Sequence, residues 1–441
     1  MGRAEDLLGL AESLVRFARR AGADQAEVAI GQGVEFTVQV RKGQIEHLVE
    51  AGSCSMGARV IVGQRVATTS SSDLSLPTLR RLLAGAVARA RLASMDPYAG
   101  LPQKQELTVD LSSLRLYDPA IASLAAGEKL RLALRTEEPC LRDARIKNSF
   151  GATCATSVGR FHLANSLGFS GSYEGSSISL GVYLQAGQGD ALVEDGWYQS
   201  ARHLADLPPP EEIAAKALQR TTRMIGARKV PTQTVPVVLE PDVTGQVLGL
   251  LFSCVSGTAI YQRQSFLVDK LGEQVASQQV TVVDDGLVPG GPGTRPFDGE
   301  GVPTRRTTVI HQGRLCSYLL DTYSGRKLGM PSTANASGPT NFYLEPGPQP
   351  PEALLASVEK GLLVTSTMGQ GFNPVTGDLS RGVFGLWIER GEIVHPVAEV
   401  TISGNLGAML RSVEMVGNDF SLRRSVIGPS IKIAELMVAG S

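Results

Sequence analysis

Residues 34–44 have the sequence Val-Glu-Phe-Thr-Val-Gln-Val-Arg-Lys-Gly-Gln, which alternates apolar and polar side chains and then reaches a Lys-Gly pair. A strand with one buried face has this period of two, and a Lys-Gly pair is typical of a turn. Residues 44–50 supply a returning strand, and a second hairpin, 58–62 with 65–68, turns at Gly63-Gln64. This part of the chain therefore predicts an antiparallel sheet built from hairpins.

Two amphipathic helices are predicted to flank these hairpins. Residues 4–20 place Leu7, Leu14 and other apolar side chains on one helical face. A second helix is expected over 77–94, because proline suits the first turn of a helix. Residues 1–100 are thus predicted to form one domain with the element order α-β-β-β-β-α.

The rest of the chain divides into two further segments. Residues 101–230 are predicted to be a middle α/β segment, with four polar, Ser- and Gly-rich strands between 143 and 204. Residues 231–441 have short apolar runs separated by Gly and Pro, which predicts a large, mostly-β C-terminal domain. The helices expected in these two segments are 125–137, 213–225, 242–256 (with Asp242 as its cap) and 352–360. The predicted fold class is α+β.

Composition narrows the class of protein. The chain has 441 residues and a net charge of −1, so no electrostatic footprint favours nucleic acid or an anionic membrane surface. It contains no apolar run long enough to span a bilayer and no signal peptide at its start. The five cysteines are scattered without a CxxC pair, which favours reduced thiols. These features together predict a cytoplasmic protein.

Three blocks near the end of the chain carry a more specific signal. Residues 368–382 are Met-Gly-Gln-Gly-Phe-Asn-Pro-Val-Thr-Gly-Asp-Leu-Ser-Arg-Gly, residues 392–405 are Glu-Ile-Val-His-Pro-Val-Ala-Glu-Val-Thr-Ile-Ser-Gly-Asn, and residues 416–419 are Val-Gly-Asn-Asp. Their order and spacing resemble the PmbA (TldE) branch of the TldD/PmbA family. Earlier blocks that match the same family are 26–28, 41–46, 69–75, 259–272, 295–301 and 323–329.

This resemblance implies a fold, a partner and a chemistry. TldD-like chains carry a His-Glu-x-x-x-His helix and a later cysteine that together hold zinc. They pair with a PmbA-like chain in a heterodimer that resembles a cage and cleaves unfolded peptides. The resemblance therefore implies a zinc metallopeptidase complex in which this chain would be the PmbA-like subunit.

The residues needed for zinc can be sought directly in the sequence. A catalytic zinc takes three protein ligands, and two histidines on one helix face must lie about one turn apart. The candidate helix 243–255 contains no histidine, and the family cysteine falls near Gly428. The five histidines, of which His395 lies inside a family block, are far apart in sequence. We therefore predict no catalytic and no metal residue in this chain, with zinc in the TldD-like partner; a site assembled from distant histidines is the alternative.

A glycine-rich segment is the remaining candidate site. High glycine content permits close approach of backbone to a ligand or partner. Asp378 and Arg381 are spaced to form an ion pair that would pin a loop over 369–382. We predict that this segment lines the peptide cavity or the partner interface; the alternative is a turn bonded only to itself. The candidate residues are Gly369, Gln370, Gly371, Asp378, Arg381 and Asn405.

The functional prediction follows from the family blocks and the missing ligands. We expect a non-catalytic PmbA/TldE-like subunit of a cytoplasmic TldD/TldE metallopeptidase complex that degrades or processes unfolded peptides. One alternative is a metallopeptidase that acts as a homodimer. Another is a binding protein that modulates a target without proteolysis.

Overall fold

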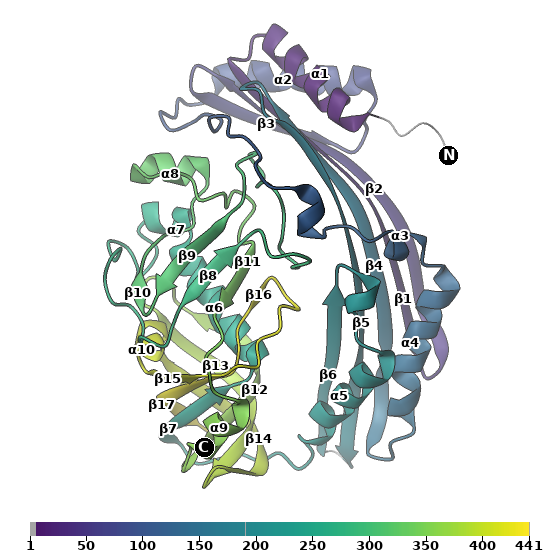
Figure 1. Cartoon of the computed structure of the whole chain (residues 1–441), viewed down its shortest axis with the longest axis vertical. Coiled ribbons are helices and arrows are strands. Elements are labelled where there is room, and N and C mark those ends of the chain that lie inside the picture. The colour runs from purple at the N-terminus through teal and green to yellow at the C-terminus, as the bar shows by residue number, and fades with distance from the viewer. Residues whose placement is uncertain (1–5, 190, 441) are drawn as a thin grey trace.

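A long, curved antiparallel sheet forms one side of the molecule, and the C-terminal domain lies against its concave face (Figure 1). The computed structural model describes residues 6–189 and 191–440. The strands of this sheet are β1 (Gln25–Arg41), β2 (Gln44–Val62), β3 (Arg65–Ser71), β4 (Ile146–Asn165), β5 (Ser170–Gln188) and β6 (Ala191–Ala201), in the order β3-β2-β1-β4-β5-β6. The predicted hairpins are therefore present, and β4 joins them to the middle segment.

Two separate cores lie on one face of this sheet. Val28 and Ile30 pack with the first pair of helices, whereas Val38 and Val40, further along the same strand, pack with the second pair. All four positions are even-numbered, so their side chains leave the strand on the same side. The first pair is α1 (Leu7–Arg20) and α2 (Leu76–Leu92), and the second is α4 (Ala126–Leu141) and α5 (Pro210–Thr222). Short helical turns are η1 (Leu111–Leu114), α3 (Pro119–Ser123) and η2 (Leu204–Asp206).

The sequence analysis predicted too many strands in each of the first two segments. The first segment has three strands instead of four, because residues 51–55 continue β2 and pair with Gly31–Glu35 of β1. The middle segment likewise has three strands, β4 to β6, instead of four. Gly and Ser clusters that resemble turns in sequence are held extended here by a paired neighbour. The boundary expected at residue 100 separates two segments that share one sheet. Positions 4 and 5 of the first expected helix lie outside the described residues.

The C-terminal domain contains two sheets with helices between and around them. One has the order β10-β9-β8-β11-β16 and the other β14-β13-β12-β7-β17-β15. Their strands are β7 (Gln233–Leu239), β8 (Val282–Asp285), β9 (Arg306–His311), β10 (Arg314–Leu315), β11 (Asn341–Leu344), β12 (Lys360–Phe372), β13 (Asp378–Glu389), β14 (Glu392–Asn405), β15 (Val413–Val416), β16 (Val426–Ile427) and β17 (Ile431–Ala439). The helices are α6 (Pro241–Val255), α7 (Gly257–Tyr261), α8 (Thr322–Leu328), α9 (Pro351–Ala356) and α10 (Leu406–Arg411). The α+β prediction is confirmed.

Helix α6 is central to this domain. It contacts β7 and β12 of one sheet and β11 and β16 of the other. Its buried side chains include Val243, Leu248 and Leu251, which belong to the large core shared by both sheets. The helix expected over 352–360 is shorter than predicted, because Lys360 already begins β12.

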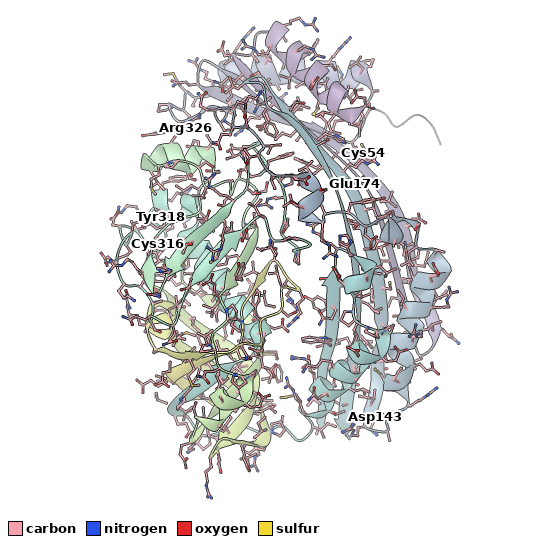
Figure 2. All side chains as sticks on the ribbon, in the orientation of Figure 1. Cys54, Asp143, Glu174, Cys316, Tyr318 and Arg326 are labelled. Carbon is pink, nitrogen blue, oxygen red and sulfur yellow. The ribbon has the colours of Figure 1, made fainter. Side chains whose placement is uncertain are left out.

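Aromatic packing and a hydrogen bond from an arginine to a backbone carbonyl hold the C-terminal domain against the N-terminal half of the chain. The Phe297 ring packs edge-on against Phe169 of the β4–β5 turn and Tyr173 of β5, at centroid distances of 5.0 and 5.3 Å. Arg326 of α8 donates from Nη2 to the carbonyl of Leu101 at 2.7 Å (Figure 2). The two parts therefore share buried contacts at more than one point.

A buried ion cluster adds a second kind of contact between these parts. The Arg59 guanidinium on β2 lies 3.2 Å from Glu27 on β1 and 3.0 Å from Glu300 of the C-terminal domain. Two carboxylates thus share one cation. Burial raises the pKa of Glu27 to about 7, although Arg59 opposes this shift. The cluster therefore places an ion pair between β2 and the C-terminal domain, at Arg59 and Glu300.

Two sequence expectations about the environment can be compared with the structure. No helix in residues 6–189 and 191–440 is long and apolar enough to cross a bilayer. All five cysteines lie within these ranges, and none of them forms a disulfide.

Candidate functional site

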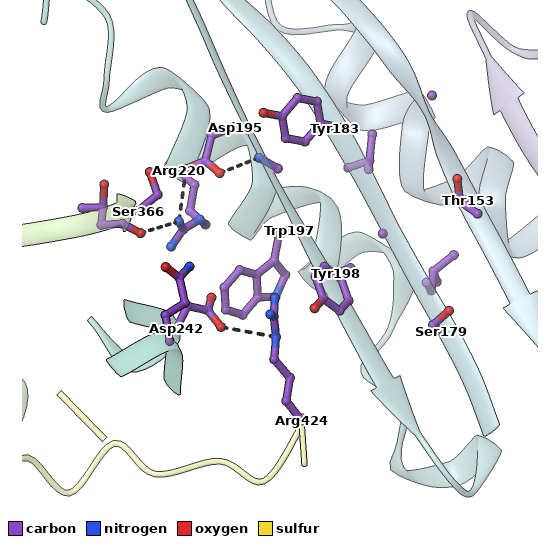
Figure 3. Close-up of a pocket in the computed structure, with 17 residues that line it drawn as sticks. Thr153, Ser179, Tyr183, Asp195, Trp197, Tyr198, Arg220, Asp242, Ser366 and Arg424 are labelled. Atoms are coloured by element: carbon purple, nitrogen blue, oxygen red, sulfur yellow. Dashed lines mark hydrogen bonds and ion pairs between the residues drawn. The ribbon is translucent and has the colours of Figure 1, made fainter. Parts of the chain in front are cut away.

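A cleft of about 480 Å³ lies between strands β5 and β6 of the long sheet and the C-terminal domain (Figure 3). The sheet supplies its aromatic wall, and α5, α6 and β12 supply polar and charged groups opposite. Its chemically distinctive lining residues are Tyr183, Asp195, Trp197, Tyr198, Arg220, Asp242, Gln246, Thr365, Ser366 and Arg424. No glycine-rich loop is needed to form it, because regular elements position every one of these groups except Arg424.

Arg220 links the long sheet to the C-terminal domain at the cleft. From α5 its Nη1 donates to Glu240 at 2.9 Å, and its Nη2 lies 3.2 Å from both the Asp195 carboxylate and the Thr365 carbonyl. The side chain is only 7% exposed. Burial alone would lower the pKa of this guanidinium, but the neighbouring carboxylates outweigh burial and raise it. Arg220 therefore stays charged and ties β6, α5 and β12 together.

Asp242 is the charged group of α6 in the cleft. Its carboxylate lies 2.7 Å from Arg423 Nη2 and 3.5 Å from Arg424 Nε. The expectation that Asp242 caps α6 is wrong. Glu240 is the cap residue and Pro241 follows it, so Asp242 already lies inside the first turn and turns toward the arginines.

Two arginines lie over the aromatic rings that the sheet contributes to the cleft. The Arg423 guanidinium lies 4.2 Å from the centre of the Trp197 ring, and Arg424 lies 4.5 Å from that of Tyr198. Cations at this distance from a ring face are attracted by its quadrupole. The cleft thus combines aromatic rings with guanidinium groups.

The residues around α6 do not fit a zinc ion. Positions Thr244 and Leu248 of α6 face Gly428, and a Cβ atom on Gly428 would lie 2.6 Å from the Thr244 Cγ2. Thr244 and Leu248 offer no nitrogen or thiolate ligand to a metal. Within residues 6–189 and 191–440, no group of three or more His, Cys, Asp and Glu side chains could hold a metal ion. Close apolar packing fills the place where the resemblance would put the ligands.

Replacing Gly428 with cysteine should therefore destabilise the protein, by about 1–3 kcal/mol, because the added atoms overpack a closed contact. Combining the change with Thr244→Ala should recover most of the loss, since the Thr244 hydroxyl has no hydrogen-bond partner to lose. Urea unfolding measures both variants. Gly249→Cys is the matched control, because a Cβ there meets no atom within 4 Å. Equal costs at 428 and 249 would contradict this account.

The glycine-rich candidate segment is a hairpin. Gly369, Gln370 and Gly371 end β12, and residues 373–377 turn into β13. Asp378 and Arg381 do not form the expected pair, because three residues along a strand place them on opposite faces. Instead, Asn405 donates from Nδ2 to Asp378 at 3.0 Å. The Arg381 Nε atom is buried and has no partner among the described residues.

Asn405 organises the end of this hairpin. Its Nδ2 also donates to the Thr376 carbonyl at 2.8 Å, and its Oδ1 accepts from the Gly407 amide at 3.1 Å as the cap of α10. The structure thus brings Asp378 and Asn405 together with a turn and a helix start. The cleft lining contains none of the six residues that the sequence analysis proposed.

Family models match three consecutive parts of this chain. They are described as PmbA/TldA metallopeptidase domain 1 over residues 26–90, central domain over 119–225 and C-terminal domain over 232–440. The chain belongs to the PmbA/TldD family. Metalloprotease PmbA of Escherichia coli O157:H7 is 35% identical over 95% of this chain and 93% of its own length. The PmbA homolog of Haemophilus influenzae is also 35% identical, over 97% and 94% of the two chains.

Solved structures agree with this placement in the PmbA/TldD family. A proposed modulator of DNA gyrase from Bacteroides thetaiotaomicron superposes with a TM-score of 0.93 at 29% identity, covering 99% of this chain and 100% of that one. TldE from Thermococcus kodakarensis superposes with a TM-score of 0.83 at 22% identity, covering 98% and 100%. The family models and the two PmbA relatives confirm the interpretation of the family blocks, including the PmbA branch.

The cleft residues of this PmbA-family chain were missed by sequence reasoning. Trp197 is one of only two tryptophans and is followed by Tyr198, and Arg423-Arg424 is a basic pair after the last family block. The tryptophan is an uncommon feature that could have been noted, whereas Arg-Arg pairs also occur at 19–20, 80–81 and 305–306. Nothing in their spacing indicates that β6, α5 and the segment before β16 meet, because the meeting depends on how the C-terminal domain docks.

Proposed function

We propose that this chain is a non-catalytic PmbA/TldE-like subunit of a cytoplasmic TldD/TldE zinc metallopeptidase complex that degrades or processes unfolded peptides. One observation carries the proposal. Helix α6 contains no histidine, and its Thr244 and Leu248 pack tightly against Gly428, near which the family cysteine would fall. A chain that keeps the scaffold and lacks metal ligands is best suited to hold substrate beside an active partner.

The cleft supports a role in holding an extended peptide. β6 is the terminal strand of the long sheet, and its Trp197 and Tyr198 face the cleft. Terminal strands can pair with an added extended chain, while pockets beside them accept alternate side chains. An unfolded peptide presents the backbone groups that such an edge requires. Hydrolysis, and the zinc that supports it, would belong to the TldD-like subunit.

The surface proposed for the partner is the free edge of β2. Strand β3 pairs only with Met56–Val62, so residues 44–55 have β1 as their one strand partner within the described chain. Three apolar side chains of this region, Ile45, Leu48 and Val49, are exposed. Long exposed edges with apolar side chains promote association between chains. We therefore assign this edge to the TldD-like subunit.

Replacing Val49 with lysine should weaken the complex with the TldD-like chain at least tenfold, because a charge on a strand edge opposes pairing. The two chains are co-expressed, and their association is followed by size exclusion with light scattering. The melting temperature of the isolated variant should change little, since the side chain is exposed. Leu92→Lys, at an 88% exposed apolar residue on α2, is the control.

The outcomes separate the proposals. If the wild-type chains elute apart at micromolar concentration and peptide cleavage is the same with or without this chain, the subunit role is wrong. If Val49→Lys and Leu92→Lys both leave the complex intact, only the assigned edge is wrong. Stoichiometric zinc in the isolated chain, lost on chelation together with peptide cleavage, would instead favour a homodimeric metallopeptidase. Target binding without any cleavage by the pair would favour a modulator.

A further inference from the structure

The ion pairs around the cleft leave one positive charge unbalanced. Two linked groups are present: Arg220 and Arg223 with Asp195 and Glu240, and Arg423 and Arg424 with Asp242. Four guanidinium groups therefore face three carboxylates. The second group carries the excess, because two arginines share the single carboxylate of Asp242.

Some hydrogen-bond donors in this cluster also lack an acceptor. The Arg424 side chain is 37% exposed, but its Nε atom is buried, lies 3.5 Å from Asp242 and has no hydrogen-bond partner among the described residues. The Nε of Arg220, a side chain that is 7% exposed, is buried and unpartnered as well. A buried donor without an acceptor is costly, so such groups indicate a ligand that accepts hydrogen bonds.

The surroundings narrow the chemistry of that ligand. Trp197 and Tyr198 provide flat apolar surface directly beside Arg424 and Arg220. A volume of about 480 Å³ suits a small ligand or a few residues of a peptide. Asp195 and Asp242 line the cleft and would repel a second negative charge, so a monoanion fits better than a doubly charged phosphate.

We propose that this cleft binds a carboxylate of the extended peptide, with Arg424 as the main donor, Arg220 behind it, and the adjacent apolar side chain on Trp197 and Tyr198. The inference rests on the proposed peptide-holding function and specifies its substrate class. Guanidinium groups bind carboxylates with paired, charge-assisted hydrogen bonds. The carboxylate is either the C-terminus of the peptide or an acidic side chain within it.

Three synthetic peptides distinguish these sources: N-acetyl-Ala-Ala-Phe as the free acid, the same peptide as its C-terminal amide, and N-acetyl-Ala-Glu-Phe amide. Isothermal titration calorimetry of the full chain gives each Kd at low salt. We expect the free acid, the Glu-containing amide or both to bind at least tenfold more tightly than the neutral amide. Inorganic phosphate at the same concentration should not displace them.

Arg424→Ala should reduce that tenfold preference to less than threefold, and Arg424→Lys should keep part of it. Arg142→Ala, at an exposed arginine on the far side of the sheet, should keep all of it. If all three peptides bind equally well, the carboxylate site is wrong while peptide holding stands. If no peptide binds, with or without the TldD-like chain, peptide holding fails too. Displacement by phosphate, or an unchanged preference in Arg424→Ala, would also overturn the carboxylate site.

Discussion

Replacing Arg220 with alanine is expected to lower the free energy of unfolding by about 3–5 kcal/mol, the usual cost of removing one partner from a buried ion pair. The side chain is buried and bonds to Asp195, Glu240 and the Thr365 carbonyl. Without it, Asp195 keeps no other ion-pair partner among the described residues, whereas Glu240 keeps Arg223. The loss should therefore come mainly from an uncompensated carboxylate on β6.

Urea unfolding of the variant and wild type measures this effect. Arg142→Ala is the matched control, because its ion pair with Glu138 is exposed and should contribute at most about 1 kcal/mol. Adding Asp195→Asn to Arg220→Ala should restore part of the stability, since it removes the unpaired charge. A loss below about 1 kcal/mol for Arg220→Ala would show that the cleft does not depend on this arginine.

Replacing Glu27 with glutamine should change how stability depends on pH. In the unfolded chain this carboxyl ionises near 4.5, but in the folded protein burial raises its pKa to about 7. Between these values the folded state binds more protons than the unfolded state, so stability falls as pH rises. Glutamine resembles the protonated form, and at pH 8 the variant should be more stable by at most about 3 kcal/mol.

The measurement is the difference in unfolding free energy between variant and wild type at pH 5, 6, 7 and 8. That difference should grow steeply from pH 5 to pH 7 and much less from pH 7 to pH 8. Glu138→Gln, at an exposed carboxylate, should show no such trend. A Glu27→Gln variant that is less stable than wild type at pH 8 would mean that the charged carboxylate stabilises the contact with Arg59 after all.

Local pattern predicted the elements well, and tertiary pairing explains the errors. The alternation over 34–40 correctly placed β1, and the apolar face around Leu7 and Leu14 correctly placed α1. Strand ends were wrong because residues 51–55, which resemble a turn, gain a full set of partners on β1. Propensity describes a residue and its neighbours in sequence, whereas a strand ends where its partner ends.

For the candidate site, too, the sequence predicted local features but not the contacts made by docking of the domains. The family blocks identified the PmbA branch, and the composition of α6 indicated a packed core helix. The cleft was not predictable, because Trp197, Arg220 and Arg424 come from elements that meet only through domain docking. The Asp378–Arg381 pair was wrong for the opposite reason: a loop was assumed where a strand continues, and strand geometry separates the two side chains.

Pairing of β1 with β4 has a consequence for synthesis of the protein on the ribosome. Residues 27–40 of β1 pair with 152–165 of β4, so one edge of β1 remains open until the later segment has left the exit tunnel. More than a hundred residues must be added in the interval, which takes on the order of ten seconds at ordinary elongation rates. During that time the nascent chain exposes an unpaired strand edge. A chaperone, or another nascent chain on the same messenger RNA, could bind this edge before β4 does. Rapid synthesis up to Asn165 would shorten this exposure.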